Sequence, residues 1–197
     1  MALGLPGVVV ALISQCQKAV IMAAMSTTQH GKFYRYVGPP EIAKRACAEA
    51  IGFPISSPDD VRIWLEQTGQ RRIGDVLIAT FVVDTNGVLR IADRRSEHIA
   101  CAGGKPVLSA GEITFSVGKE VEVVEVSNQS TGYCPEPESW PSVATALARS
   151  GLNCLQNSSN ACLFRRGDGC HSITLVKDSL FKCGMCGATL SPAYNVQ

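Results

Sequence analysis

Strong charge of either sign is missing from this sequence. Its 18 Lys and Arg residues against 17 Asp and Glu residues leave a formal net charge of +1 over 197 residues. Only 18% of the residues are charged. A strongly basic chain would point to nucleic acid or anionic lipid as a partner, so the balance gives no strong nucleic-acid signal. A local basic face inside a neutral total stays open.

An uninterrupted apolar run long enough to span a bilayer is also missing. Residues 1–24 are largely apolar, but Lys18 interrupts them, and a spanning helix needs about 20 consecutive apolar residues. No Lys or Arg precedes the run, as it would in a secretory signal. We therefore expect no membrane association. We interpret residues 1–24 as an apolar N-terminal helix or an over-long start before Met25, with a targeting or membrane role as the alternative.

An even, evenly spread set of cysteines is absent as well. The nine cysteines are odd in number, and five of them lie after residue 150. A secreted disulfide scaffold normally spreads an even number over a shorter chain. The pattern therefore indicates a reducing, cytoplasmic setting, in which the C-terminal cysteines have a local role.

What is present predicts an α+β fold, an antiparallel sheet with a few packed helices. Asn86-Gly87 between two apolar runs predicts a hairpin, and Ser57, Pro58 and Asp60 form a helix-capping pattern. The predicted strands are 32–37, 76–83, 88–92, 112–117 and 120–127, and the predicted helices are 42–51, 57–69 and 139–151. We expect three parts: residues 1–24, an α+β core at 25–151, and a small zinc-ribbon-like hairpin at 152–197.

The sequence LFKCGMCG, residues 180–187, contains a CxxC pair, Cys183 and Cys186. Twelve residues separate Cys170 from Cys183. A hairpin of strands 172–176 and 180–182, turning at 177–179, brings Cys170 beside the pair. Sulfur ligands at the open end of a hairpin are typical of a zinc ribbon. Because so short a hairpin has little core of its own, we expect bound Zn²⁺ to supply its folding free energy.

Two other roles for the CxxC pair are open. The thiols are purely structural, reduced or disulfide-linked, or they form a redox pair. A redox CxxC motif opens a helix after a strand, and Gly184, Gly187 and Pro192 oppose such a helix.

The fourth metal ligand is not evident from the spacing. The second CxxC of a ribbon would place a cysteine at position 167, where this chain has Gly167. We expect Cys162 to be the fourth ligand and His171 to be the next choice, with Asp168 and Cys154 as further alternatives. Three ligands and an open water position would be typical of catalytic zinc, but a rearranged ribbon is the favoured interpretation.

The loop 125–137 concentrates polar side chains. Ser127, Asn128, Gln129, Ser130 and Tyr133 fall within seven positions. We predict either a loop whose side chains satisfy its own backbone or a ligand-binding site. His98 lies in a second loop, 96–113, which contains Gly103-Gly104.

The order of these motifs resembles a known family. The pieces YRYVGPPE (34–41), SEHIACAGGKPVLSAGE (96–112) and SNQSTGYCPEPESW (127–140) are similar to the C-terminal domain of the plant IQ-motif calmodulin-binding family and related uncharacterised bacterial domains. The tail with FRRGDGC and ITLVKDSLFKCGMCG resembles one that accompanies the bacterial versions. The resemblance spans most of residues 32–195. The plant pattern has His before Tyr where this chain has Gly132, and the IQ motif is absent, so neither calmodulin binding nor a catalytic set is implied.

Three functions follow as hypotheses. The first is a zinc-stabilised domain that binds a protein or a small polar ligand through residues 127–133. The second is an enzyme of the ADP-ribosyl-transfer or a related nucleotide-processing type, with a polar site around Arg35, His98 and residues 127–133 and with Arg35, His98 and Glu112 as catalytic candidates. His98 acts as a general base only with a partner in reach. The third is weak nucleic-acid binding by the ribbon. Its sequence contains two acidic residues and four cations, Arg165, Arg166, Lys177 and Lys182.

Overall fold

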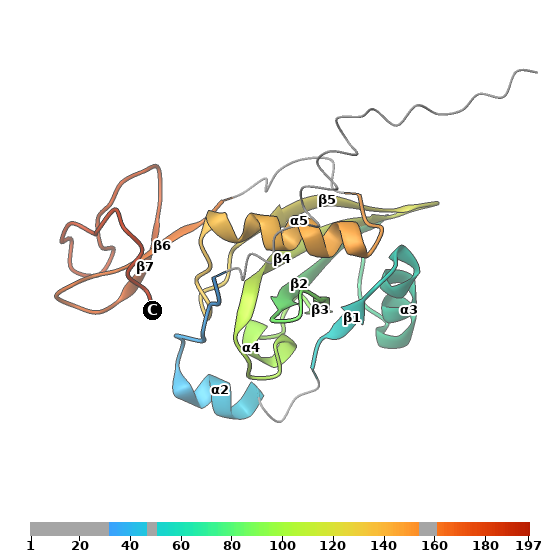
Figure 1. Cartoon of the computed structure of the whole chain (residues 1–197), viewed down its shortest axis with the longest axis horizontal. Coiled ribbons are helices and arrows are strands. Elements are labelled where there is room, and N and C mark those ends of the chain that lie inside the picture. Colours follow the sequence, from blue (N-terminus) through green and yellow to red (C-terminus); the bar gives the residue numbers. More distant parts are fainter. Residues whose placement is uncertain (1–31, 47–50, 154–160) are drawn as a thin grey trace, which may run out of the picture. The chain divides into compact units, whose positions relative to one another are not determined.

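The computed structural model describes residues 32–46, 51–153 and 161–197 (Figure 1). Gly31–Gln197 forms one compact unit. The predicted start at 1–24 and Cys154 lie outside the described residues. Among the helices of the described ranges, none has the length and apolar character needed to cross a bilayer.

A five-stranded antiparallel sheet is the centre of the fold, with the strand order β1-β3-β2-β4-β5. The predicted α+β class with an antiparallel sheet is therefore confirmed. The strands are β1 (Phe53–Ile55), β2 (Val76–Asp84), β3 (Leu89–Asp93), β4 (Val107–Val117) and β5 (Val121–Ser127).

The hairpin between β2 and β3 forms where the Asn-Gly pair predicts it. The Asp84 carboxylate accepts hydrogen bonds from the backbone N–H groups of Asn86 (2.9 Å) and Val88 (3.0 Å). Gly87 has φ of 76°, a left-handed conformation that glycine adopts without strain. Local chemistry alone therefore fixes this turn.

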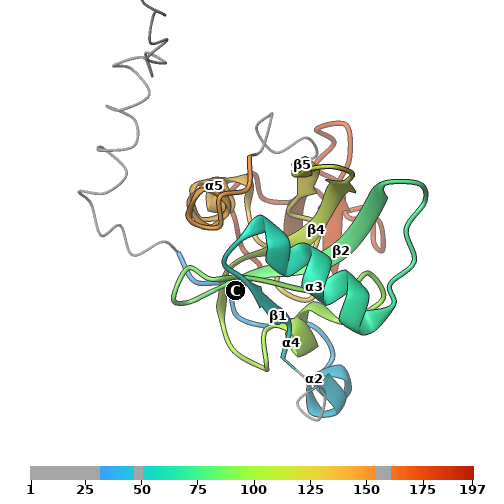
Figure 2. The ribbon, with the colours of Figure 1, turned by 90° about the vertical axis from the view of Figure 1, so that its right-hand side faces the viewer.

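In the described part of the chain, four α-helices and one 3₁₀ turn accompany the sheet. They are α2 (Pro40–Ala46), α3 (Pro58–Thr68), α4 (His98–Cys101), η1 (Pro137–Ser139) and α5 (Trp140–Arg149). At the start of α3, the Asp60 carboxylate accepts the N–H groups of Ser56 and Ser57, both at 2.8 Å. At its end Gly69 is left-handed and donates its N–H to the Leu65 carbonyl. The α3 helix contacts β1 and β5 and appears beside β1 in Figure 2.

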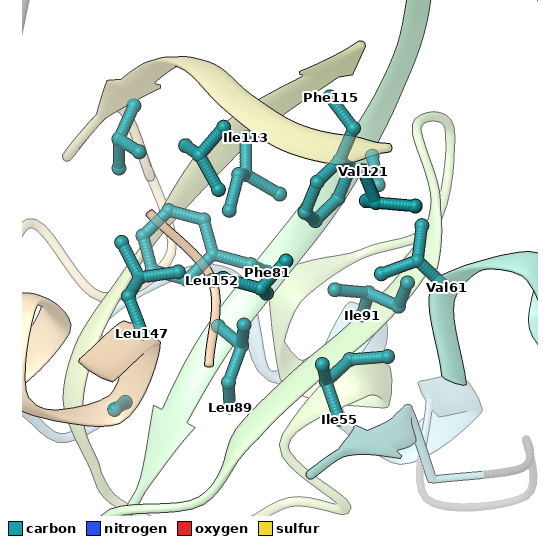
Figure 3. Packing of buried hydrophobic residues seen from close by; sticks show 14 of the residues in the cluster. Ile55, Val61, Phe81, Leu89, Ile91, Ile113, Phe115, Val121, Leu147 and Leu152 are labelled. Atoms are coloured by element: carbon teal, nitrogen blue, oxygen red, sulfur yellow. The ribbon is translucent and has the colours of Figure 1, made fainter. Parts of the chain in front are cut away.

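The main core lies between the sheet and helices α3 and α5 (Figure 3). Phe81, Ile91 and Ile113 from neighbouring strands pack with Leu147 of α5 and Val61 of α3, and each of these side chains is at most 1% exposed. Alternate residues of a strand face opposite sides of a sheet. The other face of β2 accordingly carries Val82, which packs in a second cluster with Tyr34, Ile99 and Tyr133.

Three local predictions are wrong in detail. The predicted strand 32–37 is a single bridge, in which Tyr34 and Val107 exchange backbone hydrogen bonds of 2.8 and 3.0 Å. The loop predicted at 96–113 contains the short helix α4 and the first half of β4. The third concerns the C-terminal hairpin. Its strands are β6 (Leu163–Arg166) and β7 (Ile173–Val176), whereas 172–176 was expected to pair with 180–182.

The β6–β7 hairpin is attached to the core by polar side chains. Asn128, at the end of β5, accepts the N–H of Cys162 (2.6 Å) and donates to the carbonyls of Cys162 (2.8 Å) and Pro135 (2.7 Å). Arg165 on β6 forms an ion pair of 3.1 Å with Glu136, and both side chains are largely buried. Phe164 packs nearby with Cys134 and Val196. The base of the hairpin therefore shares a small cluster with Cys134 and Val37 of the preceding chain.

Candidate metal centre

Two turns of similar shape lie at the tip of the C-terminal region. The first, residues 167–172, connects β6 to β7, and the second, residues 183–188, is closed by the isolated bridge between Lys182 and Thr189. We call them the first and second knuckle. Cys170 belongs to the first knuckle, and Cys183 and Cys186 belong to the second.

The two knuckles share one pattern of backbone hydrogen bonds. In the first, the N–H of Gly167 donates to Ser172 (2.9 Å), and the N–H of His171 donates to Gly167 (2.8 Å). In the second, position 183 donates to 188 (2.8 Å), and position 187 donates to 183 (2.9 Å). The fifth residue is left-handed in both, with φ of 57° at His171 and 71° at Gly187. The knuckles are therefore equivalent, and position 167 corresponds to position 183.

Three thiols converge between the knuckles. The Sγ atoms of Cys170, Cys183 and Cys186 all lie within 4.8 Å of one another, and those of Cys170 and Cys183 are 3.4 Å apart. Zinc–sulfur bonds of about 2.3 Å in a tetrahedron place neighbouring sulfurs roughly 3.8 Å apart. The three cysteines can therefore hold a metal ion, as their spacing predicts.

The surroundings of Cys183 favour its thiolate form. A hydrogen bond from the Thr174 hydroxyl (3.6 Å between Oγ1 and Sγ) and two backbone N–H groups of the second knuckle lower the pKa of the Cys183 thiol to about 6. The pKa of the Cys186 thiol is raised. The N–H of Ala188 lowers this pKa, but the neighbouring thiols of Cys170 and Cys183 together raise it by more. Because metals bind the thiolate, Cys183 is the ligand that is ready at neutral pH.

Of the expected fourth ligands, the three that the structure describes, Cys162, His171 and Asp168, do not join this group. Among the described histidine, cysteine and acidic residues, only the three cysteines have ligand atoms this close together. Cys162 precedes β6 at the opposite end of the strand, where it is held by Asn128 and packs against the cluster of Phe164. His171 and Asp168 are exposed on the first knuckle, and Cys154 lies outside the described residues.

The polar side chains predicted to bind a ligand are engaged inside the protein. Ser127, Asn128, Ser130 and Tyr133 are each at most 8% exposed. The Tyr133 hydroxyl donates to the Lys105 carbonyl (2.7 Å), and the Ser130 hydroxyl accepts the N–H of Tyr133 (3.3 Å). Asn128 ties the hairpin to the core, as described above. Of the five, Gln129 alone is exposed.

The three catalytic candidates have separate surroundings. Arg35 is exposed, His98 forms a hydrogen bond of 3.0 Å with the Gly111 carbonyl, and Glu112 lies 3.8 Å from Arg94. Burial lowers the pKa of His98, an effect that its hydrogen bond to Gly111 partly opposes. Within the described residues, no hydrogen bond or ion pair joins any two of Arg35, His98 and Glu112.

A groove of about 440 Å³ lies beside the hairpin. Phe164, Ile173 and Leu175 line one side, and Val37 and Thr131 line the other. The groove could not be predicted from the sequence, because its lining comes from three separate segments, around Val37, around Thr131 and in the β6–β7 hairpin.

Comparison with known proteins adds no homologue: no family model, no curated protein and no solved structure matches this chain. The resemblance to the IQ-motif family therefore stays a prediction, and the site has to be interpreted from its own geometry.

Proposed function

We propose that this chain is a zinc-stabilised binding domain. In this proposal one Zn²⁺ on Cys170, Cys183 and Cys186 fixes the two knuckles, and the groove beside the hairpin recognises a protein segment or a small polar ligand. The observation that carries it is the convergence of three thiols from two turns with matched hydrogen bonds.

The donor set favours zinc over other common metals. Calcium and magnesium prefer oxygen ligands, whereas three thiolates carried by two short turns are typical ligands of zinc. The tip around these cysteines is largely exposed, in contrast to the base of the hairpin with its buried ion pair. The metal therefore supplies order where side-chain packing does not.

The groove gives the binding role a location. Its hairpin side consists of apolar side chains from β6 and β7, the two strands that flank the first knuckle. Metal binding at the knuckle therefore stabilises one side of the groove. Apolar lining with a few polar groups at its edge, such as Arg166 and His171, is typical of ligand sites.

No observation favours nucleic acid as the partner. Arg165 is buried in its ion pair with Glu136, and the Arg166 guanidinium donates to the carbonyls of His171 (3.1 Å) and Val196 (2.9 Å). Two of the four cations expected to bind nucleic acid therefore form contacts within the protein that stabilise the hairpin.

Zinc titration of metal-free protein, followed by amide hydrogen exchange, tests the metal role. One equivalent of Zn²⁺ should slow exchange at 167–172 and 183–188, and a chelator should reverse the effect. Cys162→Ser, which changes a half-buried cysteine outside the group, should respond like the wild type. Cys183→Ser should show no protection, and equal protection in this variant would contradict the proposal.

The binding role is tested by screening a library of short peptides with NMR against the zinc-loaded protein. We expect shifts at Val37, Thr131 and Ile173, weakened after chelation. Shifts confined to other surfaces would remove the groove from the proposal while leaving the metal centre intact.

A further inference from the structure

Position 167 is the fourth ligand position of the metal centre, and this chain has no side chain there. Gly167 occupies in the first knuckle the place that Cys183 occupies in the second, as the shared hydrogen bonds show. A Cβ atom built on Gly167 would lie 2.9 Å from the Sγ of Cys170 and 3.3 Å from the Sγ of Cys183. A side chain at this position would therefore point into the thiol group.

The ligand missing at position 167 has a defined chemistry, and the thiols of Cys170 and Cys183 have to move outward to admit it, because a Cβ here would lie only 2.9 Å from the first and 3.3 Å from the second. Glycine differs from cysteine by a methylene and a thiol, so the missing ligand has the size and donor atom of a small alkyl thiol. Gly167 and Cys183 are buried, whereas Cys186 and the turn residues Asp168 and Gly169 are exposed, so a small molecule reaches the group from the side of Cys186. Zinc sites with three protein ligands keep their fourth position for an exogenous ligand.

We propose that the three cysteines form an open metal site, and that its fourth ligand is the thiolate of a low-molecular-weight thiol bound in place of the side chain missing at Gly167. This inference rests on the metal binding proposed above. On binding, a metal–sulfur bond forms, the metal-bound water leaves, and the thiol proton passes to solvent. No electron is transferred.

The test uses the full chain loaded with Co²⁺, whose sulfur-to-cobalt absorption reports the number of bound thiolates. The protein is reduced with a phosphine, so that the solution contains no small-molecule thiol at the start. Either 2-mercaptoethanol or imidazole is then added. In the wild type, 2-mercaptoethanol should raise the charge-transfer intensity by about one third, because three cobalt–sulfur bonds become four.

Two variants sharpen the test. Gly167→Cys should show the four-thiolate spectrum without added thiol and should not respond to it. Gly169→Cys is the matched control, because it adds a cysteine to the same turn at a position whose Cβ has nothing within 4 Å. It should behave like the wild type.

The outcomes separate this inference from the proposed function. A wild-type spectrum with four thiolates before any addition would overturn it, since the chain itself would then supply the fourth sulfur. A response to imidazole but not to 2-mercaptoethanol would overturn the assignment of a thiol. Failure of Co²⁺ and Zn²⁺ to bind the wild type would overturn the proposed metal centre itself. The wild-type response alone decides the question if Gly167→Cys does not fold.

Discussion

Replacing Glu136 by glutamine should destabilise the attachment of the hairpin to the core. Glu136 is 3.1 Å from the Arg165 guanidinium, and the two side chains are 15% and 5% exposed. Removing one partner of a buried ion pair costs about 3–5 kcal/mol, because the other charge stays buried. Arg165 keeps two carbonyl acceptors, Pro192 (2.9 Å) and Phe164 (2.7 Å). We therefore expect a loss near the lower end, about 3 kcal/mol.

The loss should be local to the hairpin. Amide hydrogen exchange in β6 and β7 measures it directly, and urea unfolding measures the effect on the whole domain. Arg95→Gln is the matched control, because the ion pair of Arg95 with Asp93 (3.3 Å) leaves the arginine 90% exposed. A surface pair contributes about 0–1 kcal/mol.

The reasoning fails if Glu136→Gln and Arg95→Gln change exchange in β6 and β7 equally. It also fails if the larger effect of Glu136→Gln appears in the sheet and not in the hairpin. Either result would mean that the ion pair does not hold the hairpin.

Three further predictions follow from the side-chain environments. In the metal-free protein, a thiolate titration should show a midpoint near pH 6 that Cys183→Ser removes, since the pKa of Cys183 is lowered to about 6. Because this pKa is lowered from an ordinary value of 9.0, its contribution to folding is full above about pH 9, decreases as the pH falls below that value, and is lost below about pH 6. Mass spectrometry after alkylation at pH 8 should find Cys186 modified and Cys134 unmodified, because burial raises the pKa of Cys134 to about 12. Asn128→Ala should lower the free energy of unfolding by about 2–3 kcal/mol, since it leaves one buried and two part-buried backbone groups without this partner, whereas Gln129→Ala should change it by less than about 0.5 kcal/mol; equal losses in urea unfolding would contradict this assignment.

The sheet and its turns could be predicted because their signals are local. Asn86-Gly87 determines a tight turn through its own backbone, and Asp60 caps α3 through groups three and four residues away. The same holds for the second knuckle, where the CxxC spacing and Gly187 suffice to predict a ligand-bearing turn.

The partners of the hairpin could not be predicted, because they depend on contacts between distant segments. Arg165 looks like a solvent-exposed strand cation in the sequence, but folding buries it against Glu136. Asn128 looks like a ligand-binding side chain, and it binds the backbone of Cys162 instead.

The expected role of Cys162 depended on the strand register. The sequence suggested that the strand returns Cys162 to the metal, but β6 extends away from it toward Gly167. At roughly 3.3 Å per residue, the five residue steps from Cys162 to Gly167 correspond to about 16 Å. The equivalence of position 167 with Cys183 appears only once the hydrogen bonds of both turns are known.

The metal content of the purified protein tests the central claim most directly. Elemental analysis should find one zinc per chain in the wild type and in Cys162→Ser, and none in Cys183→Ser. Wild-type protein free of metal, or zinc retained in Cys183→Ser, would contradict the assignment of the metal centre to Cys170, Cys183 and Cys186.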